Sequence, residues 1–597
     1  MDNDQLHAMR HSTAHLLAAA VQRLFPEAKF GVGPVIENGF YYDMELPRAL
    51  TPEDFSTIEG VMKELVASAL PFTREEMSLE DAIAFFAERH QPFKVELLRD
   101  LAEKGTTAVD AEADVDVLRP DVATLYKTGE VFVDLCRGPH VENTKEIGAF
   151  ALEKLAGAYW RGKEGNPMLQ RIYGLCFATQ AELDAHVHMM DEAKKRDHRK
   201  LGRELDLFAF SDLVGPGLPL FTPKGFQLRR TLEDFVWGLM KPYGYERVWI
   251  PHMAKSELYK TSGHWDKFAD DIFHVTSKKS DDVFVLKPMN CPHHTQIYAS
   301  SPRSWRDLPL RFAEVTTVYR DEHTGQLAGL TRVRSITQDD AHVFCTLDQV
   351  KQEARAIADI IAKFYAAFGM SLRPRLSLHD PAKAEKYLGA PAVWEKAEGL
   401  LRELVEDLKQ DYTVGMGEAA FYGPKIDFMA QDAIGREWQL ATIQIDFNLP
   451  ERFELDYTAA DGSKQRPVMI HRAISGSLER FIGVLIEHYA GAFPLWLAPV
   501  QVRIASVGEA HVAGVQALVQ ALKAADIRAE ADVTDATVGA KIRNASAQKI
   551  PYTIVFGDKE AQGNDFQIRV FGEEKPVVTA QADLIEAIRE TSRAQMG

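Results

Sequence analysis

A cysteine followed by two histidines stands in the segment KPMNCPHHTQ, which runs from Lys287 to Gln296. Zinc prefers thiolate and imidazole ligands, so Cys291 is a candidate metal ligand. A local zinc knuckle needs a second cysteine a few residues away. The chain has only four cysteines, and this segment holds no other. Any further ligands must therefore come from distant parts of the sequence.

A second group of such residues lies in the first 140 positions. His11 and His15 in HSTAH are one helical turn apart and share a helix face. The segment lacks the glutamate of H-E-x-x-H, so the general base of a zinc protease is missing. Further on, DLCRGPH supplies Asp134, Cys136 and His140. Two histidines with Cys-x₃-His match a metal quartet, and a structural cluster without catalysis is the alternative.

Two arginines offer sites for anions. TTVYRDEHTG places Arg320 and Glu322 at one end of a predicted strand, where alternate residues share a face. An arginine fork suits a phosphate or carboxylate, and a nearby glutamate can accept a hydrogen bond from an amino group such as that of adenine. ISGSLERFIG supplies Arg480 on a helix after a Gly-Ser turn, where small residues let a ligand approach the backbone. Taken alone, an R-x-E pair is more often a surface ion pair.

Length and composition indicate how many domains the chain has and which class of protein it belongs to. The chain has 597 residues, enough for about four domains of ~150 residues each. Hydrophobic content of 46% and charged content of 26% are ordinary for a soluble globular protein. Four scattered cysteines indicate a reducing compartment. The net charge of −18 argues against a general nucleic-acid coat, but not against one local basic surface such as KKRDHRK. A solvated helix face is the alternative for that segment.

No targeting or membrane segment is predicted. The N-terminus is polar and lacks the apolar core of a signal peptide. The most apolar long stretch, residues 481–500, contains Glu487, His488 and Pro494, so it is a poor membrane span. We therefore expect a cytoplasmic protein with no membrane partner.

The elements that must position the candidate residues fall into successive blocks. Residues 1–180 mix helical periodicity with short strands, and residues 180–207 read as a connecting helix. GPGLPLFTPKG then opens a central block that starts with a helix over residues 226–240 and closes with a helix beginning near Ser477. Strand-like runs in the central block lie at residues 283–286, 312–319, 335–338, 426–429 and 439–447. The last hundred residues alternate strands at 502–507, 552–556 and 566–571 with helices at 510–524 and 537–549, which indicates a compact α/β domain.

Three segments in order resemble the signature motifs of class II aminoacyl-tRNA synthetases: VWIP ending at Pro251, TTVYRDEHTG and ISGSLERFIG. The longer segments YRDEHTGQLAGLTRVRSITQDDAHVF, VMIHRAISGSLERFIG and MNCPHH are similar to threonyl-tRNA synthetases within that class. The resemblance covers essentially the whole chain and implies a multidomain α+β fold. It implies an N-terminal α+β editing domain (1–180), a linker helix (181–208), a catalytic domain with an antiparallel sheet and zinc (209–496) and a C-terminal α/β anticodon-binding domain (497–597). The usual small N-terminal domain of the family is expected to be absent.

The resemblance also supplies the missing metal ligands. It implies that Cys291, His342 and His471 hold one zinc ion per subunit and leave one coordination position open. In the family the metal takes the amino and hydroxyl groups of threonine, so it rejects valine but not serine. Asp340 is assigned to the threonine hydroxyl.

The ATP site is implied in the same way. Arg320 is expected to bind the α-phosphate and the substrate carboxylate, Glu322 adenine, and Arg480 the γ-phosphate. Magnesium accompanies ATP, and positioning rather than a protein nucleophile drives the reaction. Gln338 and Lys425 are expected to join Arg320, Arg480 and Asp340 in catalysis. The remaining residues implied to line the site are Met289, Arg332, Tyr422, Gln439, Thr442, Gln444 and Ser477.

The need to discriminate serine from threonine suggests a role for the N-terminal block. A binding pocket discriminates one missing methyl group by only ~1–3 kcal/mol, so a second, hydrolytic site is needed. The block, including GVGPVIENGFYYD, resembles the editing domain of the family, which hydrolyses seryl-tRNA. The implied pocket consists of His11, His15, Lys94, Asp134, Cys136 and His140. Within the family we favour water-based chemistry without a metal.

RNA contacts are expected on two surfaces. The linker helix of the family approaches the tRNA acceptor arm, which implies contacts from Lys194, Lys195, Arg196 and Arg199. The segment GAKIRNASAQKIPYTIVFGDKE resembles the anticodon module and implies Lys541, Arg543 and Arg569 as contacts. Pro251 and the helix before it imply a homodimer.

The predicted activity is ATP-dependent ligation of L-threonine to tRNA(Thr) through threonyl-adenylate, with hydrolysis of mischarged seryl-tRNA(Thr). One alternative is a synthetase-like RNA-binding protein without ligase activity. Another is a hydrolase that acts only through the N-terminal block.

Overall fold

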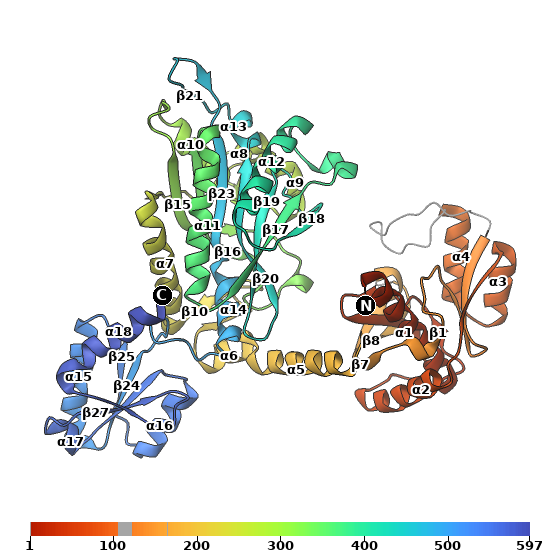
Figure 1. The fold of residues 1–597 in the computed structure, drawn as a ribbon, viewed down its shortest axis with the longest axis horizontal. Helices are drawn as coiled ribbons and strands as arrows, with labels where there is room; N and C mark the ends of the chain where they lie inside the picture. The colour runs from red at the N-terminus through yellow and green to blue at the C-terminus, as the bar shows by residue number, and fades with distance from the viewer. Residues whose placement is uncertain (1, 105–121, 164, 597) are drawn as a thin grey trace. The chain divides into compact units, whose positions relative to one another are not determined.

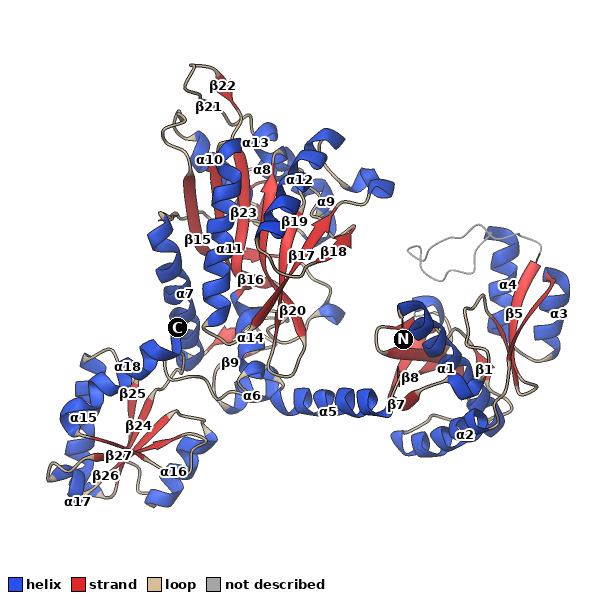
Figure 2. Cartoon of the chain, in the orientation of Figure 1, coloured by secondary structure: helices blue, strands red, loops and turns tan. Residues whose placement is uncertain are grey.

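The structure is a computed structural model that describes residues 2–104, 122–163 and 165–596. The chain divides into two compact units, Met1–Asp191 and Glu192–Gly597. Figure 1 shows the course of the chain, and Figure 2 shows its helices and strands. Among the described helices, none combines the length and apolar character needed to cross a bilayer.

The first unit is built around helix α1 (Asn3–Leu24) and an antiparallel sheet. Asp2 caps the helix, because its Oδ1 accepts from Gln5 N at 2.8 Å. The stretch LLAAAV, residues 16–21, is fully buried against the sheet and helix α2 (Phe55–Ala67), so α1 forms the centre of this core. The sheet contains β1 (Lys29–Phe30), β2 (Val35–Ile36), β3 (Gly39–Glu45), β7 (Ala149–Tyr159) and β8 (Met168–Phe177).

A second, three-stranded antiparallel sheet completes the unit. Its strands are β4 (Phe72–Ser78), β5 (Val122–Thr128) and β6 (Phe132–Leu135), accompanied by helices α3 (Leu79–Glu88) and α4 (Pro92–Lys104). Strand β6 carries Asp134, and Cys136 follows directly after it.

The second unit contains an eight-stranded sheet with the order β11-β15-β16-β23-β20-β19-β17-β18. All neighbouring strands are antiparallel except the pairs β11–β15 and β17–β18. The expected antiparallel-sheet core is therefore confirmed. The strands are β11 (Glu246–Arg247), β15 (Leu310–Tyr319), β16 (Ser335–Cys345), β17 (Ser371–Leu378), β18 (Thr413–Met416), β19 (Lys425–Gln431), β20 (Glu437–Asp446) and β23 (Val468–Ser477).

Helices cover this sheet. α11 (Val350–Ala366) and α14 (Leu478–His488) pack against its central strands, and α7 (Pro223–Met240) packs against α11 (Figure 2). Their apolar faces share one large core with the strands. Smaller elements are α8 (Ser256–Ser262), α9 (His264–Lys267), α10 (Cys291–Ala299), α12 (Pro391–Asp407), α13 (Asn448–Arg452), β9 (Phe208–Ala209), β10 (Leu220–Phe221), β12 (Met253–Lys255), β13 (His274–Val275), β14 (Phe284–Leu286), β21 (Tyr457–Thr458) and β22 (Lys464–Gln465).

Strand β16 is much longer than the expected run 335–338. It continues through Asp339 and Asp340, whose adjacent charges favour a turn in a sequence reading. Asp339 is fully buried, and its carboxylate accepts from the backbone N–H groups of Ile474 and Ser475 and pairs with Arg472. These partners stand on β23, so only the folded sheet makes a charged residue acceptable inside a strand.

The connecting segment also differs from expectation, because it forms two helices instead of one. α5 (Gln180–Arg196) ends before Asp197, and α6 (His198–Glu204) begins after it. Asp197 caps the second helix, since its Oδ1 accepts from Arg199 N at 2.8 Å.

The C-terminal segment forms the expected small α/β module. Its sheet order is β25-β24-β26-β27-β28, with parallel pairs on both sides of β24. Strand β26 coincides with the predicted residues 552–556. The elements are β24 (Val502–Ser506), α15 (Val512–Ala524), β25 (Ala529–Asp532), α16 (Val538–Ala547), β26 (Tyr552–Phe556), α17 (Asp558–Ala561), β27 (Phe566–Val570), β28 (Val577–Thr579) and α18 (Leu584–Met596).

Candidate functional site

Cys291, His342 and His471 lie together, with one candidate ligand atom from each within 4.8 Å of the others. Cys291 is the first residue of α10, whereas His342 and His471 are directly opposite each other on β16 and β23. All three side chains are buried. Residues 180 positions apart in the sequence are thus brought into one group by the register of two strands.

Each histidine of this group has one ring nitrogen engaged by a neighbour. His342 Nδ1 lies 2.7 Å from His294 Nδ1, and His471 Nε2 lies 2.9 Å from Asp446 Oδ2. His342 Nε2 lies 3.7 Å from Asp340 Oδ1, too far for a hydrogen bond, so each histidine keeps one ring nitrogen for a metal. Metal-binding histidines usually bond to such an outer partner, which fixes the tautomer and the orientation of the ring.

Burial makes this group costly without a metal. Burial, followed by the charges of Asp340 and Asp446, raises the pKa of Cys291 well above its ordinary value. Burial, followed by the neighbouring His294 and His471, lowers the pKa of His342 well below its ordinary value. A divalent cation would favour the thiolate and bind neutral imidazoles. The sulfur and two nitrogen donors therefore fit zinc.

Three arginines lie at the ends of strands and helices in the same unit. Arg320 follows β15, Arg332 lies in the loop between β15 and β16, and Arg480 is in the first turn of α14. Burial lowers the pKa of Arg480, and the positive charge of Arg332 lowers it further. The Nε atoms of Arg320 and Arg480 are buried and have no hydrogen-bond partner among the described residues. Like charges with unused donors indicate a site for a polyanion.

Tyr422 connects the arginines to the candidate metal ligands. Its ring lies 5.0 Å from that of His471. Burial, followed by Cys291, raises the pKa of Tyr422 well above its ordinary value, and the charge of Arg320 acts in the opposite direction. Glu322 accepts from Arg332 Nε at 2.8 Å, so the expected adenine ligand is paired with an arginine in this structure. Met289 lies against the same arginine group, with its sulfur 3.1 Å from Arg320 Nη2.

The remaining expected site residues line strands β16, β19, β20 and β23. Asp340 Oδ2 accepts from Asn290 Nδ2 at 2.9 Å. Gln338 and Ser477 are cross-strand partners. Ser477 caps α14 by accepting from Arg480 N at 3.2 Å, which fixes the first turn that carries the arginine.

Sequence reasoning missed Asp427, which is fully buried on β19. Its carboxylate accepts from Lys425 Nζ at 2.6 Å and from Thr442 Oγ1 at 3.0 Å. It therefore orients two of the expected site residues. Two further expected site residues, Gln439 and Gln444 on β20, also have polar partners. Gln439 Oε1 accepts from Arg375 Nη2, and Gln444 Nε2 donates to Gly423 O. The segment IDFMA gave a weak signal, because Asp427 is its only charged residue among apolar neighbours.

The Gly-Ser turn before α14 has a different physical reason from the one expected. Gly476 has a φ of +71°, and a Cβ there would lie 2.6 Å from Leu440 O. Glycine is thus required by the backbone conformation and by the neighbouring strand, whether or not a ligand approaches.

The N-terminal candidates also form one group. His11 and His15 come from α1, whereas Cys136 and His140 follow β6, and their ligand atoms lie within 4.8 Å of one another. Cys136 Sγ lies 3.3 Å from His11 Nε2 and 3.1 Å from His140 Nε2. His140 Nδ1 lies 3.0 Å from Ser12 Oγ, a partner that sequence reasoning missed.

Asp134 and Lys94 lie next to this group, since Asp134 contacts His15 and pairs with Lys94. Their buried side chains form an ion pair, and Lys94 also donates to Gly31 O at 2.7 Å. Asp134 Oδ2 accepts from Tyr42 OH at 2.5 Å and lies 3.4 Å from His15 Nε2. The six residues expected for the N-terminal pocket are therefore brought together.

The electrostatics of this pocket favour neutral groups. Burial lowers the pKa of His11 to about 4 and lowers those of His15 and His140 as well. Burial, followed by the charge of Asp134, raises the pKa of Cys136 to about 12. The Nδ1 atoms of His11 and His15 have no hydrogen-bond partner among the described residues. They can therefore exchange hydrogen bonds with a bound water or substrate.

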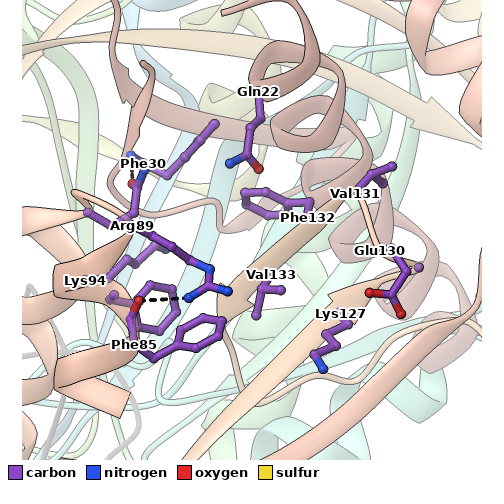
Figure 3. Close-up of a pocket in the computed structure, with 13 residues that line it drawn as sticks. Gln22, Phe30, Phe85, Arg89, Lys94, Lys127, Glu130, Val131, Phe132 and Val133 are labelled. Carbon is purple, nitrogen blue, oxygen red and sulfur yellow. Dashed lines mark hydrogen bonds between the residues drawn. The ribbon is translucent and has the colours of Figure 1, made fainter. Parts of the chain in front are cut away.

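A separate cavity of about 260 Å³ lies in the same unit (Figure 3). Its lining includes Phe30, Gln91, Lys94 and Phe132. Gln91 uses both ends of its amide within the unit, on Phe30 N and Ala28 O. Lys94 also lines this cavity, but its ammonium group binds Asp134 and Gly31 O. The buried polar atoms of this lining are thus engaged elsewhere.

The expected RNA-contacting residues are not all at the surface. Lys194, Lys195 and Arg199 are exposed, whereas Arg196 is partly buried and donates to His488 O at 3.4 Å. In the C-terminal module Arg543 and Arg569 are exposed.

The structure contradicts the prediction that Lys541 contacts RNA. Its side chain is only 2% exposed, and its ammonium group donates to Ser506 O at 2.9 Å and to Ser506 Oγ at 3.0 Å. The amine is directed into the module, so an RNA contact by this residue does not agree with the structure. Sequence reading assigned it by charge, which does not reveal burial.

Three family models match parts of the chain. The tRNA synthetase class II core domain (G, H, P, S and T) matches residues 273–489. The Threonyl and Alanyl tRNA synthetase second additional domain matches residues 123–173, and the Anticodon binding domain matches residues 501–591. The first match contains the candidate metal ligands and the three arginines. The second contains Asp134, Cys136 and His140.

Relatives match over nearly the whole chain. The threonine–tRNA ligase of Gloeobacter violaceus is 50% identical over 576 residues, which cover 95% of this chain and 89% of the relative. That of Halalkalibacterium halodurans is 46% identical over 595 residues, covering 99% and 89%. A crystal structure described as the RNA binding domain of threonyl-tRNA synthetase from Cryptosporidium parvum Iowa II aligns with a TM-score of 0.64 at 34% identity, covering 66% of this chain and 98% of that one. The chain therefore belongs to the threonine–tRNA ligase family.

Proposed function

We propose that this chain ligates L-threonine to tRNA(Thr) with ATP, through a threonyl-adenylate. The observation that carries the proposal is a Cys-His-His group on the antiparallel-sheet domain together with three arginines carried by the same domain. A polyanion and a metal-binding amino acid are the substrates that such a site suits. Family membership supports the same activity over a hydrolase or an RNA-binding protein without ligase activity.

In the first step, a carboxylate oxygen of threonine attacks the α-phosphorus of ATP, and pyrophosphate leaves. We assign Arg320 to the α-phosphate and the carboxylate, and Arg480 to the γ-phosphate. Their buried, unused N–H donors support these roles. Glu322 would leave its pairing with Arg332 to accept from the adenine amino group. Magnesium accompanies ATP, and catalysis comes from positioning and from stabilisation of phosphate charge.

We assign Cys291, His342 and His471 to one zinc ion per subunit. Bound zinc would coordinate the amino and hydroxyl groups of threonine, and valine lacks the hydroxyl group. Asp340 is assigned to the threonine hydroxyl. The outer partners His294 and Asp446 keep the two imidazoles oriented.

The other residues of the site have supporting roles in this proposal. Asp427 holds Lys425 and Thr442 in place. The proposed lining is completed by Met289, Arg332, Gln338, Tyr422, Gln439, Gln444 and Ser477. We propose the domain boundaries 1–180, 181–208, 209–496 and 497–597 for editing, linker, catalytic and anticodon-binding parts.

We assign the hydrolysis of seryl-tRNA(Thr) to the N-terminal pocket, without a metal. Water would attack the ester carbonyl, releasing serine and restoring the 3′-terminal hydroxyl of the tRNA. The neutral imidazoles of His11 and His15 can hold that water, because their Nδ1 atoms are otherwise unpartnered in the described structure. Cys136 and His140 frame the same space, and Lys94 neutralises Asp134.

The proposed RNA contacts are electrostatic. Lys194, Lys195, Arg196 and Arg199 are assigned to the acceptor arm, and phosphate contacts of this kind position RNA without reading its sequence. Arg543 and Arg569 are assigned to the anticodon arm.

We also propose a homodimer that functions in the cytoplasm. Trp249, 76% exposed, and Phe226, 56% exposed, line one hollow together with residues of α7. Large exposed aromatic side chains of this kind favour a protein partner. The hollow lies next to Pro251, where the class II resemblance places the dimer motif.

The decisive test is threonine-dependent ATP–pyrophosphate exchange by zinc-loaded protein, with serine and valine measured in parallel. We expect exchange with threonine, weaker exchange with serine and none with valine. Absence of exchange with threonine from folded, zinc-loaded protein would refute the ligase assignment.

The editing assignment has its own test. Seryl-tRNA(Thr) hydrolysis should disappear in His11→Ala while threonine-dependent exchange stays at the wild-type rate. Unchanged hydrolysis in that variant would place editing elsewhere.

A further inference from the structure

Asp197, His198 and Glu487 form another group of potential ligand atoms, outside the sites described above. His198 is 5% exposed and Glu487 6% exposed. His198 Nδ1 lies 2.6 Å from Glu487 Oε1, and His198 Nε2 accepts from Leu330 N at 3.0 Å. Both ring nitrogens are therefore engaged by protein, so the group is not available as a metal site.

The two partners fix the state of the imidazole. The backbone N–H of Leu330 can only donate, so His198 Nε2 must carry a lone pair. Glu487 is ionised and can only accept, because its other oxygen pairs with Arg436 Nη2 at 2.6 Å. His198 is thus a neutral imidazole with its proton on Nδ1. The same Glu487 oxygen accepts from the backbone N–H of His198 at 3.0 Å, which holds the start of α6.

Leu330 stands at the tip of a tight turn in the loop between β15 and β16. Ala328 and Arg332 close the turn, because Ala328 N donates to Arg332 O at 3.1 Å. Gly329 has a φ of +53°, and a Cβ there would lie 2.2 Å from His198 Nε2. The approach of the imidazole to the turn is therefore so close that only glycine is tolerated at this position.

The turn leads directly to the arginine group. Arg332, which closes it, donates from Nε to Glu322 at 2.8 Å and from Nη2 to Gln326 at 3.0 Å. Its charge acts on Arg480. A shift of the turn would therefore move a guanidinium that faces the proposed triphosphate site.

We propose that His198 is a positioning residue for ATP binding, acting through the Leu330 amide on Arg332. His198 touches neither substrate. It ties α6, the first helix after the linker helix α5, to the loop that carries Arg332, and α14 supplies the anchor through Glu487. The inference rests on the proposed ligase function only for its kinetic consequence, since the geometry of the turn is independent of it.

Two substitutions separate the two hydrogen bonds of the imidazole. His198→Asn keeps a donor near the Nδ1 position but cannot reach Leu330. His198→Gln places an amide oxygen near the Nε2 position and keeps the acceptor for Leu330. His198→Ala removes both. His488→Ala is the matched control for His198→Ala, because His488 Nδ1 likewise accepts a backbone N–H, that of Ala433, at 2.9 Å, but in a different loop.

The experiment uses the full zinc-loaded chain. Threonine-dependent exchange gives kcat and the KM values for ATP and threonine, and hydrogen exchange with mass spectrometry follows the peptide of residues 323–334. We expect His198→Asn and His198→Ala to raise the KM for ATP about tenfold, as for the loss of one hydrogen bond. The KM for threonine and kcat should change less than about threefold in the same variants, because Arg332 contacts neither threonine nor the reacting atoms. The 323–334 peptide should exchange faster in these two variants, and His198→Gln and His488→Ala should behave as wild type.

Three results would overturn the proposal. They are an unchanged KM for ATP in His198→Ala, an unchanged exchange of the 323–334 peptide, and a uniform loss of protection that also includes α11 and β20. The last result would assign His198 to general stability. If the wild-type protein shows no threonine-dependent exchange, the ligase function fails, while the hydrogen-exchange comparison still decides whether His198 holds the turn.

Discussion

Asp446→Asn tests the outer partner of a proposed zinc ligand with little change to the fold. Asp446 Oδ2 lies 2.9 Å from His471 Nε2, and a carboxylate can only accept there. His471 therefore carries its proton on Nε2 and has a lone pair on Nδ1 for a metal. Asp446 Oδ1 accepts from Asn448 N at 2.7 Å and Leu449 N at 3.0 Å, which starts helix α13.

Asparagine would keep the acceptor for both backbone N–H groups and place its NH₂ group opposite His471 Nε2. Two donors would then face each other, so His471 would move its proton to Nδ1, the atom that the metal needs. Loss of such an outer partner typically weakens metal binding 10–100-fold. This corresponds to about 1.4–2.7 kcal/mol of binding free energy. The fold should survive, because the start of α13 remains bonded.

The measurement is zinc affinity by competition with a chromophoric chelator, with circular dichroism to verify folding. Asp432→Asn is the matched control. Asp432 is also buried and accepts from two backbone N–H groups, those of Ile434 and Arg436, but it contacts none of the three proposed ligands. Wild-type affinity in folded Asp446→Asn, or an equal loss in Asp432→Asn, would refute the reasoning.

Three further predictions concern the editing pocket, the ATP site and the core. Because burial lowers the pKa of His11 to about 4, its imidazole is almost entirely neutral above about pH 5.5. The rate of seryl-tRNA hydrolysis should therefore show no protonation step between pH 5.5 and 7, and an apparent pKa near 6.5 in the rate profile would contradict this. Arg480→Ala should raise the KM for ATP by at least ~10-fold, as expected for a lost hydrogen bond between charged groups, and a KM within twofold of wild type in the exchange assay would argue against the γ-phosphate role. Arg472→Met would leave Asp339 buried without its cation, so chemical denaturation should report a loss of about 3–5 kcal/mol in the free energy of unfolding, with a loss below 1 kcal/mol as the contrary result.

Much of the local structure could be predicted from the sequence. The predicted strand 552–556 coincides with β26, and the predicted helix 226–240 corresponds to α7, which begins at Pro223. Both segments have strong periodicity and clear Gly or Pro boundaries, so local preferences and packing agree. The prediction of a single connecting helix was wrong, because Asp197 separates two helices there. An aspartate within a charged, helix-favouring segment has no local feature that distinguishes an N-cap from a surface position.

The candidate site shows the same division. The sequence resemblance named Cys291, His342 and His471, and the structure brings their ligand atoms within 4.8 Å. Their outer partners, His294 and Asp446, were not assigned from the sequence. No spacing relates Asp446 to His471, because the two stand on neighbouring strands whose register is set by the whole sheet.

The sequence by itself determined which chemical groups this protein has: a thiol and imidazoles for a metal, arginines for phosphate, and a second histidine group at the other end. The tertiary structure decided which of them act together. It buried Lys541 on Ser506, although its charge favoured an RNA surface. It also joined His198 to Glu487 and Leu330, which are separated from it by 289 and 132 positions. The physical reason is that hydrogen bonds and ion pairs act over a few ångströms, and only strand register and helix packing bring such distant residues that close.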